Sequence, residues 1–148
     1  MTIWIGIDPG SRSGAYAVIN DDACTVKLWD DVQFVKDMML ITACEDKAFA
    51  VVEKVGAMPK QGLRSTWVFA ENFGYIQGVL HAFSIPYQLV PPKVWKKEYS
   101  ITSDKSQSID VCRRLFPEVS LKRTERSRID DNNFAEATLM AEYARRHF

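Results

Sequence analysis

Residues 3–20 read IWIGIDPGSRSGAYAVIN and contain two apolar, β-rich runs separated by a turn with Gly and Pro. The first run ends at Asp8-Pro9-Gly10, and the second begins at Gly14. Short β-rich runs separated by turn residues are typical of a β-hairpin or the start of a meander. We therefore predict two neighbouring strands here, with Asp8 held at the rigid end of the first strand.

The rest of the sequence continues with strands that alternate with helices. Apolar runs of strand length stand at residues 24–29, 48–52 and 86–90, and the second run places Glu53 at a strand end. Helical patterns cover residues 31–44, 66–83, 93–97, 103–115 and 133–146. This order predicts a single α/β domain over residues 1–148, with a mixed central β-sheet flanked by helices. Strand ends are the usual ligand sites of such folds.

The composition excludes several classes of protein. A chain of 148 residues with 47% hydrophobic and 26% charged residues fits one globular domain, and it fits neither a disordered chain nor a disulfide scaffold. No stretch approaches the roughly 20 apolar residues of a transmembrane helix, and no secretory signal opens the chain. We expect a protein of the cytoplasm, or of the host cytoplasm if the chain is viral. The three cysteines lack metal-ligand spacing and are predicted to be free thiols.

The net charge is zero, but the charges are unevenly distributed along the chain. Residues 51–128 hold thirteen Lys and Arg against seven Asp and Glu. Residues 1–50 hold four against eight, and residues 129–148 hold two against four. This asymmetry fits a protein whose middle segment contacts phosphates while its ends supply carboxylates.

Three carboxylates stand where ionised side chains need a partner. Asp8 and Glu53 end buried-looking strands, and Glu136 lies in the apolar stretch 134–141, where an unpaired charge is costly. Oxygen ligands of this kind suit Mg²⁺. Two such ions roughly 3.5–4 Å apart can activate water and stabilise the leaving oxygen in phosphodiester hydrolysis. The structural alternatives are a turn-forming Asp8 and ion pairs, which would join Glu53 to Lys54 or Arg64 and Glu136 to Arg126 or Arg128.

Four motifs in this order resemble those of the RuvC-type Holliday junction resolvases, in particular the small phage-type members. The motifs are IGIDPGS at 5–11 with GAYAV at 14–18, VVEKV at 51–55, PPKVWKK at 91–97 with SDK at 103–105, and RLFP at 114–117 with AEA at 135–137. The resemblance spans nearly the whole chain. Sugar kinases and actin-like ATPases share the opening motif, but they need a much longer chain.

The resemblance implies an RNase H-like nuclease that acts as a homodimer. It implies a metal-dependent crossover junction endodeoxyribonuclease that resolves four-way junctions by paired symmetric nicks, in DNA recombination and repair. Asp8, Glu53 and Glu136 would hold Mg²⁺, two ions per site, with Mn²⁺ as a substitute. Lys105 matches a family lysine near the active site and would stabilise developing charge on the phosphate. No nucleotide cofactor and no membrane partner are expected.

The fourth metal ligand is less clearly marked. Many family members carry an Asp or His three positions before the final carboxylate, and this position is Asn133 here. Asp131 lies five positions before Glu136, so it cannot share a helix face with Glu136, but from the loop or N-cap it can turn back toward the metal. We predict Asp131 as the fourth ligand and keep Asp130 and Asn133 as alternatives.

Basic residues flank the carboxylates in the sequence and are predicted to contact DNA phosphates, which gives affinity without base specificity. They are Lys54, Lys60, Arg64, Lys93, Lys96, Lys97 and Lys105. Trp95, among these lysines, is either a stacking platform for a base or a core anchor. Gly56 stands where some members carry an aromatic wedge that opens the junction, and Met58 or Trp67 is expected to replace it.

The dimer interface is expected on the helix that carries Gly74 and Gly78, with Phe73, Gln77 and His81 close to one face. Three other functions compete with the resolvase. The first is a nuclease of the same fold that cuts flaps, replication forks or structured RNA. The second is a catalytically silent junction-binding protein, which Asn133 favours because an acid is missing there. A small nucleotide-phosphate binder that uses the turn at 8–11 is a third alternative.

Overall fold

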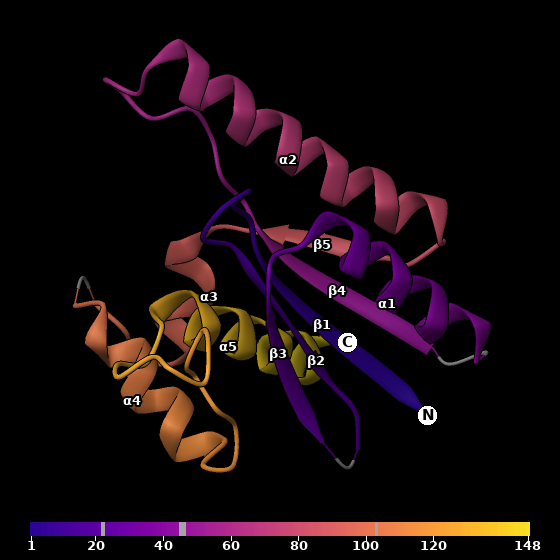
Figure 1. Cartoon of the computed structure of the whole chain (residues 1–148). Coiled ribbons are helices and arrows are strands. Elements are labelled where there is room, and N and C mark those ends of the chain that lie inside the picture. Colours follow the sequence, from indigo (N-terminus) through magenta and orange to yellow (C-terminus); the bar gives the residue numbers. More distant parts are fainter. Residues whose placement is uncertain (22, 45–46, 103) are drawn as a thin grey trace.

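Five strands form one mixed sheet in the order β3-β2-β1-β4-β5, in a computed structural model that describes residues 1–21, 23–44, 47–102 and 104–148 (Figure 1). The strands are β1 (Thr2–Asp8), β2 (Ala15–Ile19), β3 (Cys24–Leu28), β4 (Lys47–Glu53) and β5 (Tyr87–Val90). β1 pairs antiparallel with β2 and parallel with β4, and β4 pairs parallel with β5. The predicted opening hairpin and the mixed central sheet are confirmed.

Helices cover both faces of this sheet (Figure 1). The helices are α1 (Asp31–Ala43), α2 (Leu63–Ala82), α3 (Pro92–Glu98), α4 (Ser106–Leu115) and α5 (Asn132–His147). One hydrophobic core lies between the sheet and helices α1 and α2, and a second joins the other face to α3, α4 and α5. Every predicted helix is present, but α2 begins at Leu63, three residues before the predicted start. The predicted start of α4, Ser103, lies outside the described residues.

Helix α5 lies unusually close to the central strand. A Cβ atom placed on Gly6 of β1 would stand 2.2 Å from the carbonyl oxygen of Ala137 and from the amide nitrogen of Ala141. Alanines at 135, 137, 141 and 144 form much of the buried face of α5 and keep its backbone near the sheet. Gly6 therefore allows the close contact that places the first turns of α5 beside the end of β1.

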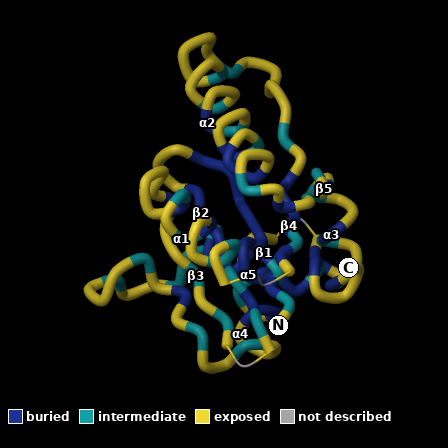
Figure 2. The backbone as a smooth tube through the Cα atoms, turned by 90° about the vertical axis from the view of Figure 1, so that its right-hand side faces the viewer, coloured by how far each residue is buried: buried dark blue, intermediate teal, exposed yellow. Residues whose placement is uncertain are grey.

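Helix α2 extends beyond the sheet at its N-terminal end, and Figure 2 shows that end as a largely exposed segment. Its buried residues are Asn72, Ile76, Val79 and Leu80, and none of them lies among the first nine residues of the helix. No helix in the described ranges is long and apolar enough to cross a membrane. Cys24, Cys44 and Cys112 are free thiols, as predicted.

Candidate active site

Three carboxylates meet at one edge of the sheet. Asp8 ends β1 and Glu53 ends β4, and because these strands are parallel neighbours, both side chains reach the same edge. Glu136 comes from the second turn of α5, which packs across this edge. One oxygen of each carboxylate lies within 4.8 Å of the others, and the three residues are only 7–9% exposed. The structure therefore brings together the three acids that the sequence singled out.

Burial and mutual repulsion perturb these acids. Burial raises the pKa of Asp8 well above its usual range, and the charges of Glu53 and Glu136 raise it further. The pKa of Glu53 is also raised, first by burial and then by Glu136. Three close, buried carboxylates are costly unless cations neutralise them. The all-oxygen donor set fits a hard divalent ion such as Mg²⁺.

Helix α3 supplies the polar contacts of the two glutamates. The indole Nε1 of Trp95 donates a hydrogen bond to Oε2 of Glu53 at 2.9 Å. The Nζ atom of Lys96 lies 3.3 Å from Oε1 of Glu136. Glu136 therefore pairs with this lysine rather than with Arg126 or Arg128. Trp95 is fully buried, so of its two predicted roles the structure supports the core anchor and excludes the stacking platform.

Asp131 caps α5 and stays outside the group of three. Its Oδ1 accepts the backbone N–H groups of Asn133 and Phe134 at 2.8 and 3.1 Å, and its Oδ2 lies 3.4 Å from Nε of Arg123. Its charge still contributes to raising the pKa of Asp8. The role of Asp131 as fourth ligand stays a prediction.

The two alternatives for the fourth ligand have other partners. Asp130 forms an ion pair with Arg113. The Nδ2 atom of Asn133 donates to the backbone carbonyl of Ser13 at 2.8 Å. Asn133 thus ties the β1–β2 turn to α5, which helps to hold Asp8 and Glu136 in register.

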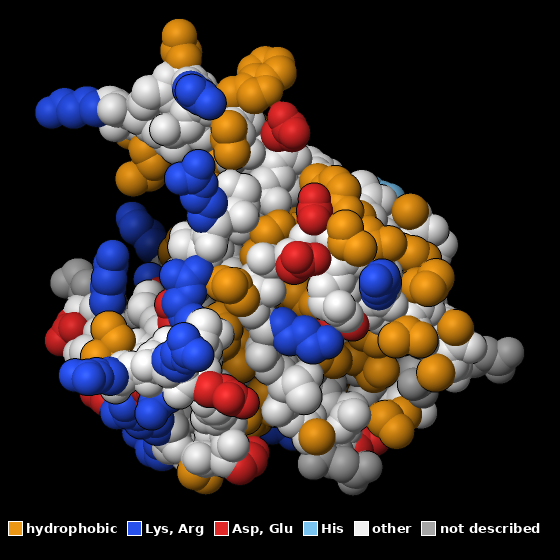
Figure 3. Space-filling view, viewed as in Figure 1, with side chains coloured by type: hydrophobic (Ala, Val, Ile, Leu, Met, Phe, Trp, Pro, Cys, Tyr) orange, Lys and Arg blue, Asp and Glu red, His pale blue; other side chains and the backbone are white. Residues whose placement is uncertain are grey.

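The other predicted basic residues are exposed on elements that surround the acids. Lys54 and Lys60 lie in the loop after β4, Arg64 lies in the first turn of α2, and Lys93 and Lys97 lie on α3. Figure 3 shows Lys and Arg side chains gathered around the hollow between the projecting end of α2 and the region of α3 and α4. Lys105 is exposed at the start of α4, and the lysine that contacts the acids is Lys96. The catalytic role of Lys105 stays a prediction.

A cavity of about 390 Å³ lies between the turn that follows Asp8 and the start of α2. Its polar lining includes Ser11, Arg12, Ser13 and Arg64. Hydroxyl and guanidinium donors beside a carboxylate centre are suited to a phosphate backbone.

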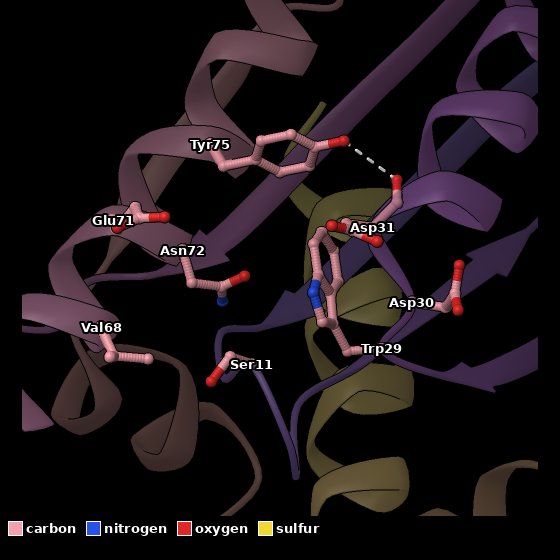
Figure 4. Close-up of a pocket in the computed structure, with 8 residues that line it drawn as sticks. All are labelled: Ser11, Trp29, Asp30, Asp31, Val68, Glu71, Asn72 and Tyr75. Carbon is pink, nitrogen blue, oxygen red and sulfur yellow. Dashed lines mark hydrogen bonds between the residues drawn. The ribbon is translucent and has the colours of Figure 1, made fainter.

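A second cavity of about 330 Å³ lies between α2, the β1–β2 turn and the start of α1 (Figure 4). Its charged lining residues, Asp30, Asp31 and Glu71, are all acidic, and Tyr75 donates a hydrogen bond to the carbonyl of Asp31. Negative charge repels phosphates, so we do not expect nucleic acid to enter this cavity.

A mixed sheet with carboxylates at the ends of two parallel strands and on the packed helix is an RNase H-like arrangement. Solved structures that share the fold include Holliday junction resolvases, as the motifs predicted. T. thermophilus RuvC in complex with a Holliday junction substrate has a TM-score of 0.63 and 13% identity, over 99% of this chain and 97% of that chain. A second Thermus thermophilus RuvC structure has a TM-score of 0.59 and 16% identity, over 97% and 96% of the two chains.

The yeast mitochondrial Holliday junction resolvase Ydc2 has a TM-score of 0.53 and 11% identity, over 93% of this chain and 75% of that chain. No protein-family model matches the chain, and no curated protein sequence matches it. At these identities the comparisons establish the fold, and the chain has the RNase H-like fold of the RuvC-type resolvases.

Sequence reasoning missed two contacts of the site. Lys96 was expected on DNA and Trp95 was left without a partner, yet both touch the glutamates. The available signal was the segment PPKVWKK, in which two prolines end a strand and fix the start of the next helix. This helix, α3, follows β5 directly, and β5 lies beside β4, the strand that ends at Glu53. The adjacent Trp and Lys of the segment therefore lie near Glu53.

Proposed function

We propose that this protein is a metal-dependent endonuclease that resolves four-way DNA junctions by paired symmetric nicks. The observation that carries the proposal is the buried group of Asp8, Glu53 and Glu136 at the sheet edge, in a chain with the fold of junction resolvases. Carboxylates buried this close together repel one another and destabilise the fold unless cations neutralise them. Phosphodiester hydrolysis uses such metal-holding sites.

Asp8, Glu53 and Glu136 would hold Mg²⁺, with Mn²⁺ as a substitute, and two ions per site are proposed. When bound, the ions supply an activated water and stabilise the leaving oxygen. These three side chains would orient the ions. Both histidines have other partners, since His81 bonds to Tyr87 and His147 bonds to Glu98. Neither therefore serves as a general base at the acids.

Asp131 is proposed as the fourth ligand, and the capping geometry allows a clean test. Asn is as good an N-cap as Asp, so Asp131→Asn removes the charge and keeps the helix start. We expect this variant to bind Mn²⁺ more weakly and to lose cleavage at unchanged stability. Wild-type cleavage by the variant would show that Asp131 only caps α5.

The basic side chains around the hollow would contact the phosphates that flank the scissile bond. The residues proposed for this contact are Lys54, Lys60, Arg64, Lys93, Lys96, Lys97 and Lys105. Contacts of this type give salt-dependent affinity, so binding should weaken steeply as the salt concentration rises. Met58 and Trp67 are 69% and 74% exposed on the projecting end, and they are proposed to open the junction by insertion between bases.

A homodimer is proposed because a two-fold junction presents two scissile strands. The outward side of α2 carries small residues every fourth position, Ala70, Gly74, Gly78 and Ala82, and all four are exposed. Nothing in the described chain lies within 4 Å of a Cβ atom placed on Gly74 or Gly78, so a second α2 could approach closely. The three residues expected beside these glycines at the interface face the protein's own sheet instead. Phe73 packs toward the sheet, and Gln77 and His81 form hydrogen bonds with Tyr87 of β5.

Cleavage of a substrate panel tests the proposal. A labelled four-way junction, a flap, a fork and an RNA duplex are incubated with the protein in Mg²⁺, and binding is measured in parallel in Ca²⁺. The proposal predicts paired nicks in the junction at a rate far above the other substrates. Faster cleavage of the flap, fork or RNA would favour the alternative nuclease. Tight junction binding without nicks in Mg²⁺ or Mn²⁺ would favour the silent junction-binding protein, which the substitution at Asn133 motivates.

A further inference from the structure

We propose that Trp95 is a positioning residue of the metal site, which holds the Glu53 carboxylate in its ligand orientation through the indole N–H. This inference rests on the proposed metal-dependent function and adds a requirement to it. The indole lies at 2.9 Å from Oε2 of Glu53, and this contact joins α3 to the end of β4. Trp95 belongs to the motif PPKVWKK, which contains no acidic residue.

The chemistry of the indole suits this role. An indole N–H is a donor only, so it can neither accept a proton from the carboxylate nor take the place of a metal ligand. It occupies one side of Oε2 and leaves the remaining lone pairs of the Glu53 carboxylate free. A neutral donor also adds no positive charge that would compete with a divalent ion. Glu53 is thereby oriented without being neutralised.

The indole is itself held rigidly. Trp95 is fully buried, and its ring meets the ring of Tyr99 edge to face at a centroid distance of 6.5 Å. The hydroxyl of Tyr99 donates to the backbone carbonyl of Leu139 at 2.9 Å. Leu139 lies one turn after Glu136 on α5. One chain of contacts therefore runs from Glu53 through α3 to the helix that carries the third acid.

The same indole also contacts the ammonium group of Lys96. The Nζ atom of Lys96 lies 5.4 Å from the centroid of the Trp95 ring and 3.3 Å from Oε1 of Glu136. Two consecutive residues of α3 thus contact the two glutamates, Trp95 through a hydrogen bond and Lys96 through an ion pair. Lys96 offers a charge, which a bound metal would replace, whereas the hydrogen bond from Trp95 is compatible with a bound metal. Without this bond, repulsion from Glu136 would turn Glu53 away from the shared site.

The experiment compares Trp95→Phe with wild type in metal binding without DNA. Mn²⁺ affinity is measured by calorimetry on metal-free protein, and folding is checked by circular dichroism and thermal unfolding. Loss of a hydrogen-bond partner behind a metal ligand typically lowers metal affinity about 10- to 100-fold, and we expect a loss of this size. Trp4→Phe is the matched control, because Nε1 of Trp4 is buried and has no partner among the described residues. Its Mn²⁺ affinity should equal that of wild type.

Wild-type Mn²⁺ affinity in a folded Trp95→Phe protein would overturn the inference and leave the proposed function intact. Absence of Mn²⁺ binding by wild type would instead overturn the proposed function.

A nuclear magnetic resonance titration of the wild-type protein decides the question if Trp95→Phe does not fold. Mg²⁺ should shift the indole N–H resonance of Trp95 more than those of Trp4, Trp29 and Trp67. An unmoved Trp95 resonance at saturating Mg²⁺ would contradict the positioning role.

Discussion

At the scale of single residues, the acids of the site lower the stability of the metal-free protein. Asp8 is buried beside Glu53 and Glu136, and only Lys96 among the described residues forms an ion pair with any of the three. Repulsion between buried carboxylates is the expected condition of a site built to be completed by a cation. Stability and function therefore oppose each other at these positions.

Asp8→Asn should stabilise the metal-free protein at neutral pH, by about 0.5–2 kcal/mol. The raised pKa of Asp8 means that the folded state keeps a proton at a pH where the unfolded chain has already lost it. The contribution of Asp8 to stability is therefore fully present below its ordinary pKa of 3.8 and is lost as the pH rises through the raised value. Urea unfolding in EDTA should show an advantage of Asp8→Asn that grows from pH 4.5 to pH 8. An advantage that shrinks with rising pH would contradict the repulsion.

A divalent ion should make wild type more stable than Asp8→Asn, the reverse of the ranking in EDTA. The ligands must be deprotonated to bind metal, so Mn²⁺ affinity should fall as the pH drops through the raised pKa values of Asp8 and Glu53. At neutral pH and 100 times the dissociation constant, Mn²⁺ should add about 2.7 kcal/mol to the free energy of unfolding of wild type. Asp8→Asn should gain much less. Thermal unfolding with and without Mn²⁺ measures both proteins, and an equal gain in the two would place the ion elsewhere.

At the scale of elements, the site depends on how closely α5 lies on β1. Gly6 is the residue that permits this contact, because any side chain there would collide with the backbone of α5 at Ala137 and Ala141. Backbone atoms cannot move aside as the end of a flexible side chain can. The position of Glu136 relative to Asp8 is thus set by a residue without a side chain.

Gly6→Ala should destabilise the protein by about 3 kcal/mol and abolish metal binding, because α5 must move off the sheet. Gly56→Ala is the matched control, since a Cβ atom there would meet nothing within 4 Å. Urea unfolding and Mn²⁺ calorimetry of both variants test the claim. A Gly6→Ala protein with wild-type stability would show that α5 is not seated as described.

Strand ends could be predicted from the sequence because apolar runs and turn residues mark them locally. Asp8 and Glu53 followed directly from those runs, and Glu136 followed from an acid in an apolar stretch. The contacts from Trp95 and Lys96 could not be predicted, because they depend on where α3 sits after β5 joins the sheet. The predicted helix start at residue 133 left Asp131 in the loop or N-cap, and the structure places it at the N-cap. Its contact with Arg123 could not be predicted, because it depends on how the loop before α5 folds back.

At the scale of the whole molecule, the described residues of one chain form one buried group of acids, while a four-way junction has two strands to cut. Paired cleavage therefore requires two copies with a fixed relation. The outward side of α2 has room for this contact, since its glycines face open space. The N-terminal end of α2 projects beside the basic hollow (Figure 3). Trp67 in the first turns of α2 and Met58 in the loop before it are both exposed.

Gly74→Glu should convert the proposed dimer into a monomer, because it puts a charged side chain in the closest part of the α2 contact. Glu is a better helix former than Gly, so the helix itself should not weaken. Light scattering gives the mass, and paired nicks should become single, unpaired nicks. Met39→Glu on the exposed side of α1 is the control and should leave the mass unchanged. A Gly74→Glu protein with the same mass as wild type would place the interface on another surface.

We propose that Asp8, Glu53 and Glu136 form a metal-dependent site for phosphodiester hydrolysis. The most direct test of this proposal is cleavage of an end-labelled four-way junction by metal-free wild type and Glu136→Gln, before and after addition of Mg²⁺. We expect paired symmetric nicks only for wild type and only with Mg²⁺, while both proteins bind the junction equally in Ca²⁺. Cleavage by Glu136→Gln at the wild-type rate, or cleavage by wild type in EDTA, would contradict the proposal.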